Sequence, residues 1–143
     1  MDELYEKLIE LLESIPEINY IDLDAGQLQE QNPPLSYPAI LVSIEDDRED
    51  IDKLNQSVDG KFTLTIIDKL YSETNNLAPK EQRVKGLSYL KLVKAVQKKL
   101  QGYEDRRFRS FTNKGSKDPK IKKGLKTAVL QWETSWIDSY NSN

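Results

Sequence analysis

The strongest constraint on the fold is a group of prolines directly in front of a short apolar run. The segment QNPPLSYPAILVSIEDD, residues 31–47, contains Pro33, Pro34 and Pro38, and proline is excluded from helix interiors. Because proline lacks an amide donor, Pro38 fits the first position of a strand. Side chains alternate between the two faces of a strand, so we predict a strand from residue 38 with an apolar inner face. The residues predicted on that face are Ile40, Val42 and Ile44.

A second strand is predicted by the alternating segment KFTLTIID, residues 61–68. The polar run before it ends in Asp59-Gly60, a pair typical of turns. We therefore predict an antiparallel pair of strands joined by a long acidic connection, with one face of the pair exposed to water. The side chains predicted to face the core are Phe62, Leu64 and Ile66, and those predicted to face water are Lys61, Thr63 and Thr65.

Two helices are predicted where apolar residues recur at spacings of three and four. The first covers residues 2–14 and stops at Pro16, and the second covers residues 80–102 and stops at Gly102. The first apolar stripe consists of Leu4, Leu8, Leu11, Leu12 and Ile15. The second consists of Val84, Leu87, Leu90, Val93, Val96 and Leu100.

The rest of the chain adds shorter strands and one long strand. We predict a short strand near residues 20–23, another in DRRFRSFT at 105–112, a lysine-rich loop at 113–124 and a last strand at 125–138. The element order predicts one α+β domain over residues 1–143. Its antiparallel sheet has about four strands, with the long helix packed on one face and an N-terminal helix before it.

Composition removes much enzyme chemistry. The 143 residues include no Cys and no His, which excludes disulfides, zinc sites of the usual kind and Ser-His or Cys-His nucleophiles. The six glycines are scattered, so no glycine-rich phosphate loop is present. No apolar run approaches the roughly 20 residues that cross a bilayer, and the acidic start lacks the regions of a secretory signal. We therefore expect no catalytic activity, no cofactor, no membrane contact and a cytoplasmic location.

The net charge of −3 is a cancellation between an acidic and a basic part. Residues 1–79 carry 5 basic and 18 acidic residues, whereas residues 80–126 carry 16 basic and 4 acidic ones. Such a chain can bind a polyanion through its basic part, or it can bind copies of itself head to tail.

The densest acidic cluster follows the first predicted strand. It consists of Glu45, Asp46, Asp47, Glu49, Asp50 and Asp52. A Mg²⁺ or Ca²⁺ site would need converging oxygens, and the run lacks the glycine-punctuated spacing of a calcium loop. A solvated acidic hairpin loop is the favoured interpretation, and we predict no metal site.

The basic region offers two interpretations. Its cations are Arg106, Arg107, Arg109, Lys114, Lys117, Lys120, Lys122 and Lys123. Interleaved with Phe108 and Phe111, they would suit a small nucleic-acid-binding accessory protein that uses residues 106–126 to bind phosphates and stack bases. Alternatively, Phe108 faces the core and the arginines face water. The acidic remainder of the chain would repel a polyanion, which favours the second interpretation.

Several phrases together resemble a known family. These are LYEKLIELLESIPEI, PPLSYPAILVSIEDD, KFTLTIID, RVKGLSYLKLVKAVQKKLQGY and LKTAVLQWETSWID. In their order and in their residues these segments resemble the tail terminator or tail completion proteins of long-tailed bacteriophages and their prophage relatives. The resemblance covers nearly the whole chain, and none of the phrases is a catalytic motif.

The resemblance implies a structural virion protein. Members of this family form a ring, typically six-fold, on the end of the tail tube, where they stop polymerisation and join the tail to the head or neck. The implied partners are further copies of the chain, the tail tube protein and a head or neck protein, with DNA only in the lumen. The implied location is the virion tail, after assembly in the host cytoplasm. We interpret the acidic cluster and the basic region as surfaces for subunit or tube contacts.

Overall fold

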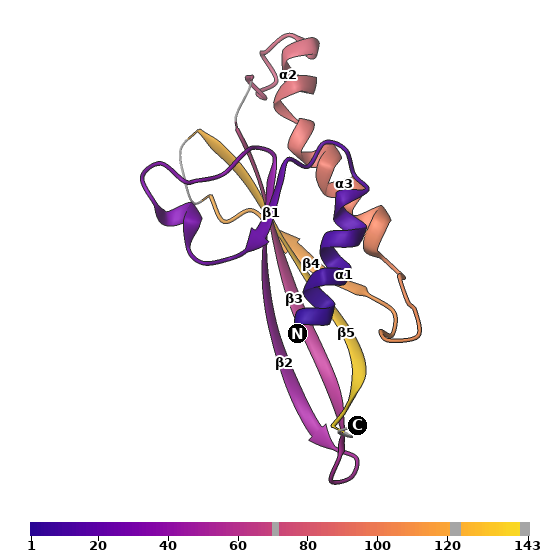
Figure 1. Ribbon diagram of the computed structural model, residues 1–143. Coiled ribbons are helices and arrows are strands. Elements are labelled where there is room, and N and C mark those ends of the chain that lie inside the picture. The colour runs from indigo at the N-terminus through magenta and orange to yellow at the C-terminus, as the bar shows by residue number, and fades with distance from the viewer. Residues whose placement is uncertain (70–71, 121–123, 141–143) are drawn as a thin grey trace.

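The computed structural model describes residues 1–69, 72–120 and 124–140. These residues form one sheet with the strand order β1-β2-β3-β5-β4 (Figure 1). Its strands are β1 (Tyr20–Leu23), β2 (Ala39–Asp50), β3 (Asn55–Lys69), β4 (Thr112–Lys117) and β5 (Leu125–Ser139). The α+β class is confirmed, but the sheet has five strands rather than about four. It is also mixed rather than antiparallel, because β1 pairs parallel to β2.

The helices lie on one face of this sheet. Helix α1 (Asp2–Glu13) and helix α3 (Ser88–Leu100) pack beside each other over the strands, while α2 (Lys80–Gly86) extends beyond the end of the sheet (Figure 1). A short 3-10 turn, η1 (Gln27–Gln29), lies in the connection after β1. The N-terminal helix is therefore confirmed within one residue.

The long helix predicted over residues 80–102 is instead two helices that meet at Leu87. Gly86 packs so closely on the preceding segment that a Cβ there would lie 2.6 Å from the carbonyl oxygen of Ser72 and 2.5 Å from Cγ2 of Thr74. This close approach leaves no room for a side chain at the last residue of α2. The prediction was wrong because the apolar spacing continues through both helices and carries no sign of the break.

The core lies between the helices and the covered face of the sheet. Phe62 and Trp132 stack at its centre with parallel rings 5.9 Å apart, and Phe111 meets Phe62 edge-on at 5.2 Å. The inner-face positions predicted for the first two long strands are confirmed as core residues, namely Ile40, Val42, Phe62, Leu64 and Ile66, with Ile44 packed against them half-buried. The last strand adds Ala128, Leu130, Trp132 and Trp136 to the same core.

The opposite face is only partly exposed. Leu28, Leu35 and Tyr37, from the connection between β1 and β2, cover Leu41 and Ile67 there. Thr65, predicted to face water, is consequently buried at 9% exposure. The prediction of one water-exposed face is wrong around Leu41 and Ile67, because the proline-rich connection folds back over that part of the sheet.

Beyond the helices, β2, β3 and β5 continue as a three-stranded arm. The acidic run that was predicted to be a loop lies inside β2, and the turn between β2 and β3 consists only of residues 51–54. The Asp59-Gly60 pair lies inside β3 and makes no turn. Gly60 is needed because a Cβ there would lie 2.4 Å from the Trp136 ring. Sequence alone could not distinguish this requirement from a turn signal.

The strand predicted at 105–112 is a folded loop. Asp105 accepts hydrogen bonds from the amides of Arg107 and Phe108 at 2.8 and 2.7 Å, which bends the chain there. The strand at this edge is β4, whose residues after Thr112 were predicted to be loop. The last strand is confirmed, since β5 begins at the predicted residue 125.

Candidate interaction surfaces

The predicted acidic residues divide between the two faces of β2. Strand alternation places Glu45, Asp47 and Glu49 on the face that carries no helix, and Asp46 and Asp50 on the other. Within the described residues, none of the first three carboxylates has an ion-pair partner. They form an exposed anionic strip along the outer part of the sheet.

Arg48, a residue that the sequence reading did not single out, neutralises part of the acidic run. Its guanidinium lies 2.7 Å from Asp138 and 3.1 Å from Asp46. It also donates a 2.8 Å hydrogen bond to the hydroxyl of Tyr140. Arg48 therefore fastens β2 to the end of β5, across the intervening β3.

Arg107 takes part in the same network from the other side. It pairs with Asp138 and with Glu3 of α1, and it donates to the backbone carbonyl of Ile137. Burial by itself would raise the pKa of Asp138, but hydrogen bonds from Arg48 and Arg107 hold that pKa below its ordinary value. Of the predicted basic site residues, Arg107 thus has an internal structural role.

Phe108 and Phe111 belong to the core, at 3% and 0% exposure. Phe108 meets Trp136 edge-on at 5.6 Å. The core interpretation of Phe108 is confirmed, and neither ring is available to stack on a base. The base-stacking part of the predicted nucleic-acid surface, which needed these two rings to be exposed, is therefore not formed by them.

The remaining predicted cations are exposed. Arg106, Arg109, Lys117 and Lys120 face solvent, and Lys114 lies 3.7 Å from Glu133. Lys122 and Lys123 lie outside the described residues. The structure brings Lys114 and Lys117 together on β4, at the opposite edge of the sheet from β1 and β2.

A row of alternating charge crosses the helix-free face. Glu45 on β2 is the register partner of Lys61 on β3, and Lys61 is the partner of Glu133 on β5. Lys114 of β4 completes the row beside Glu133. We call these four residues the charge row. Lys61 and Glu133 were missed from sequence because only the strand register places them between the two predicted surfaces.

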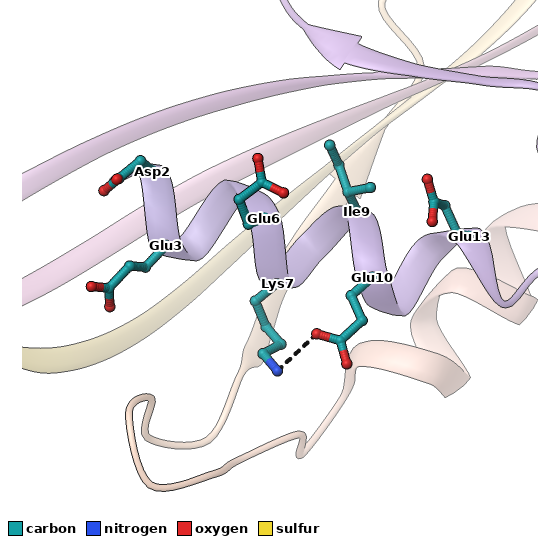
Figure 2. Close-up of a pocket in the computed structure, with 7 residues that line it drawn as sticks. All are labelled: Asp2, Glu3, Glu6, Lys7, Ile9, Glu10 and Glu13. Atoms are coloured by element: carbon teal, nitrogen blue, oxygen red, sulfur yellow. Dashed lines mark hydrogen bonds and ion pairs between the residues drawn. The ribbon is translucent and has the colours of Figure 1, made fainter.

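Helix α1 carries a second acidic surface. Asp2, Glu6 and Glu13 are exposed and project from the helix in Figure 2, while Lys7 pairs with Glu10 at 3.0 Å. These side chains lie on an open surface and do not converge on a point. In the portion of the chain that the structure describes, no group of three or more acidic side chains is arranged to hold a metal ion.

The tip of the arm is apolar rather than acidic. Ile51 and Leu54 are 55% and 47% exposed in the turn between β2 and β3. The turn is ordered by Asp52, which accepts hydrogen bonds from the amide of Leu54 and the side chain of Asn55 at 2.8 and 2.9 Å. Two apolar side chains are thus exposed at the end of the arm.

No family model and no curated protein matches the sequence. A chain from the solved virion of a native gene transfer agent particle has a similar fold, with a TM-score of 0.53 and 15% sequence identity. The match covers 91% of this chain and 84% of that chain. The likeness establishes a common α+β fold over almost the whole of both chains. Within the described residues, no helix is long and apolar enough to cross a membrane.

Proposed function

We propose that this protein is a structural component of a phage-like particle that caps the end of the tail tube as a ring of identical copies. In this role it stops tube polymerisation and joins the tail to the head or neck, without catalytic activity. Its partners are further copies of itself, the tail tube protein and a head or neck protein. DNA passes only through the lumen of the ring.

The observation that carries the proposal is the fold likeness to a chain of a gene transfer agent virion, because it spans 91% of this chain. The order of elements and the phrases that resemble tail terminator proteins point the same way. The surface features also favour assembly: unpaired charges of opposite sign lie on separate parts of the molecule, and the arm presents exposed apolar residues.

A tube cap needs one surface for its neighbours in the ring and another for the tube. In this proposal the arm tip, with Ile51 and Leu54, contacts the tube, because it extends beyond the helices and is held rigidly by its turn. The charged parts of the sheet then serve the ring contacts. Lys120 is the exposed cation assigned to the tube end or lumen.

The test is deletion of the gene from the phage-like element that encodes it. We expect tail tubes of uncontrolled length that lack heads in electron micrographs, and restoration by the gene in trans. A second measurement is sedimentation velocity of the purified chain, in which a discrete ring-sized species is expected. Tails of normal length with heads attached after deletion would refute the capping role.

The arm tip provides a more specific variant. Exchanging Ile51 and Leu54 for Ser leaves the fold intact, since exposed substitutions of this kind usually change stability by within about 0.5 kcal/mol. We expect the variant to complement the deletion poorly while keeping its circular dichroism spectrum. The matched control exchanges Leu77, which is 89% exposed at a distance from the arm, for Ser and should complement normally. Full complementation by the tip variant would exclude the tip as the tube contact.

A further inference from the structure

The strand order gives the sheet two free edges of opposite charge. The outer side of β2 is unpaired beyond Val42, because the register with β1 ends at Leu23 and Val42. The outer side of β4 is unpaired because β4 is the last strand of the described sheet and pairs only with β5. We call Glu45, Asp47 and Glu49 the acidic edge, and Lys114 and Lys117 the basic edge.

The charge row relates these two edges. It runs negative, positive, negative, positive from Glu45 on β2 to Lys114 on β4. It therefore ends with a carboxylate at one edge and an ammonium group at the other. A second copy placed edge to edge continues the alternation, because its Lys114 comes next to Glu45 of the first copy.

The strand directions allow this continuation without turning the second copy over. β2 runs antiparallel to β3, β3 to β5 and β5 to β4, so β4 is antiparallel to β2 within one chain. A neighbour related by a rotation about a ring axis can then bring its β4 antiparallel to β2. The same contact repeats from copy to copy, which is the condition for a closed ring.

The contact is made by side chains rather than by a continuous backbone ladder. β4 has a register shift between Asn113 and Gly115, and the amide of Asn113 already donates to the side chain of Gln101 at 2.9 Å. Short, bulged, lysine-bearing edges of this kind resist strand addition. The acidic edge also repels a second acidic edge, which disfavours a two-fold pairing of β2 with β2.

We infer that the partner of both edges is a second copy of this chain, whose Lys114 forms an ion pair with Glu45 of its neighbour. The inference rests on the proposed function, since it identifies the contact that closes the ring. Ion pairs at a solvent-exposed edge weaken with added salt, so the contact is reversible and salt-sensitive.

Cysteine cross-linking tests the contact directly, because the chain has no native Cys. A double variant, Glu45→Cys with Lys114→Cys, is oxidised at low salt and examined on a non-reducing gel. The two positions are three strand spacings apart in one copy, about 14 Å, which is too far for an internal disulfide. We expect a ladder of oligomers up to a closed ring. An equal mixture of the two single variants should stop at dimers, because each chain then has one cysteine.

A matched control places the cysteines on the helices, as Glu6→Cys with Lys94→Cys, where no ladder is expected. A second pair of variants reverses charge: Glu45→Lys in one and Lys114→Glu in the other. Each should lower self-association roughly tenfold or more, and mixing the two should restore it. Glu6→Lys on α1 changes the net charge as much as Glu45→Lys does and should leave association unchanged.

The inference is overturned if the double cysteine variant yields only monomer, or if the helix pair cross-links equally well. The gene deletion separates this failure from failure of the proposed function. Overlong, headless tails without a cross-linked ladder would leave the capping role standing and remove the edge contact. A ladder together with normal tails after deletion would establish the contact and remove the capping role.

Discussion

Exchanging Gly60 for Ala should destabilise the protein through a single steric contact. The added Cβ would lie 2.4 Å from Cζ3 and 2.8 Å from Cη2 of Trp136, whose side chain is only 4% exposed. That ring cannot swing away freely, because it packs edge-on against Phe108 and its Nε1 donates to Asp138 at 3.1 Å. Overpacking of this kind costs about 1–3 kcal/mol.

Two effects set the net magnitude. Removing glycine from a strand interior recovers about 0.5–1 kcal/mol of conformational entropy. The net loss in the free energy of unfolding should therefore be about 1–2 kcal/mol. Urea unfolding followed by far-ultraviolet circular dichroism measures it. With a urea dependence of about 2 kcal/mol per molar, the midpoint should fall by roughly 0.5–1 M.

Trp136→Phe provides the matched background. Phenylalanine lacks the second ring of the indole, to which Cζ3 and Cη2 belong, so Gly60→Ala should cost little in that background. The double-mutant cycle should give a coupling free energy of about 1–2 kcal/mol between the two positions. If Gly60→Ala costs the same in both backgrounds, contact with Trp136 is not the reason for glycine at this position.

Further predictions concern the core, the helix break and the ion network. Leu8→Ala should lower the free energy of unfolding by about 2–5 kcal/mol, because the side chain is fully buried against the sheet. A shift of the urea midpoint no larger than that caused by a substitution at an exposed position would contradict this. Gly86→Ala should cost about 1–3 kcal/mol in the same assay, because the new Cβ meets the backbone oxygen of Ser72. The pKa of Asp138 is lowered in the folded state, so its contribution to stability is present above about pH 4 and is lost as the pH falls through the folded pKa. Urea midpoints from pH 6 to 2.5 should therefore decline less steeply in Asp138→Asn than in the wild type, and equal slopes would remove this residue from the acid response.

Residues that were selected from the sequence by charge density alone have different surroundings in the structure. Glu45 and Lys117 were found from charge density alone, and both lie exposed where a partner can reach them. Arg107 was found by the same criterion, yet the structure uses it to hold Asp138 and Glu3. Charge density locates cations along the chain, but it does not show which of them have partners within the fold.

The sequence by itself determined the inner faces of the first two long strands, the first helix and the absence of cysteine chemistry. These follow from local rules: side chains alternate along a strand, apolar residues repeat along a helix, and a missing residue type cannot react. The positions of single elements and their buried sides are therefore readable without knowledge of any neighbour.

Only the tertiary structure decided how the elements meet. Five features depend on which segments lie side by side, and in what register. They are the length of the arm, the glycine that leaves room for Trp136, the helix break at Gly86, the parallel pairing of β1 and the charge row. Register is set by contacts between residues far apart in the chain, such as Lys61 and Glu133. A polar run such as residues 45–50 thus forms a strand because β3 extends beside it, a pairing that local periodicity does not encode.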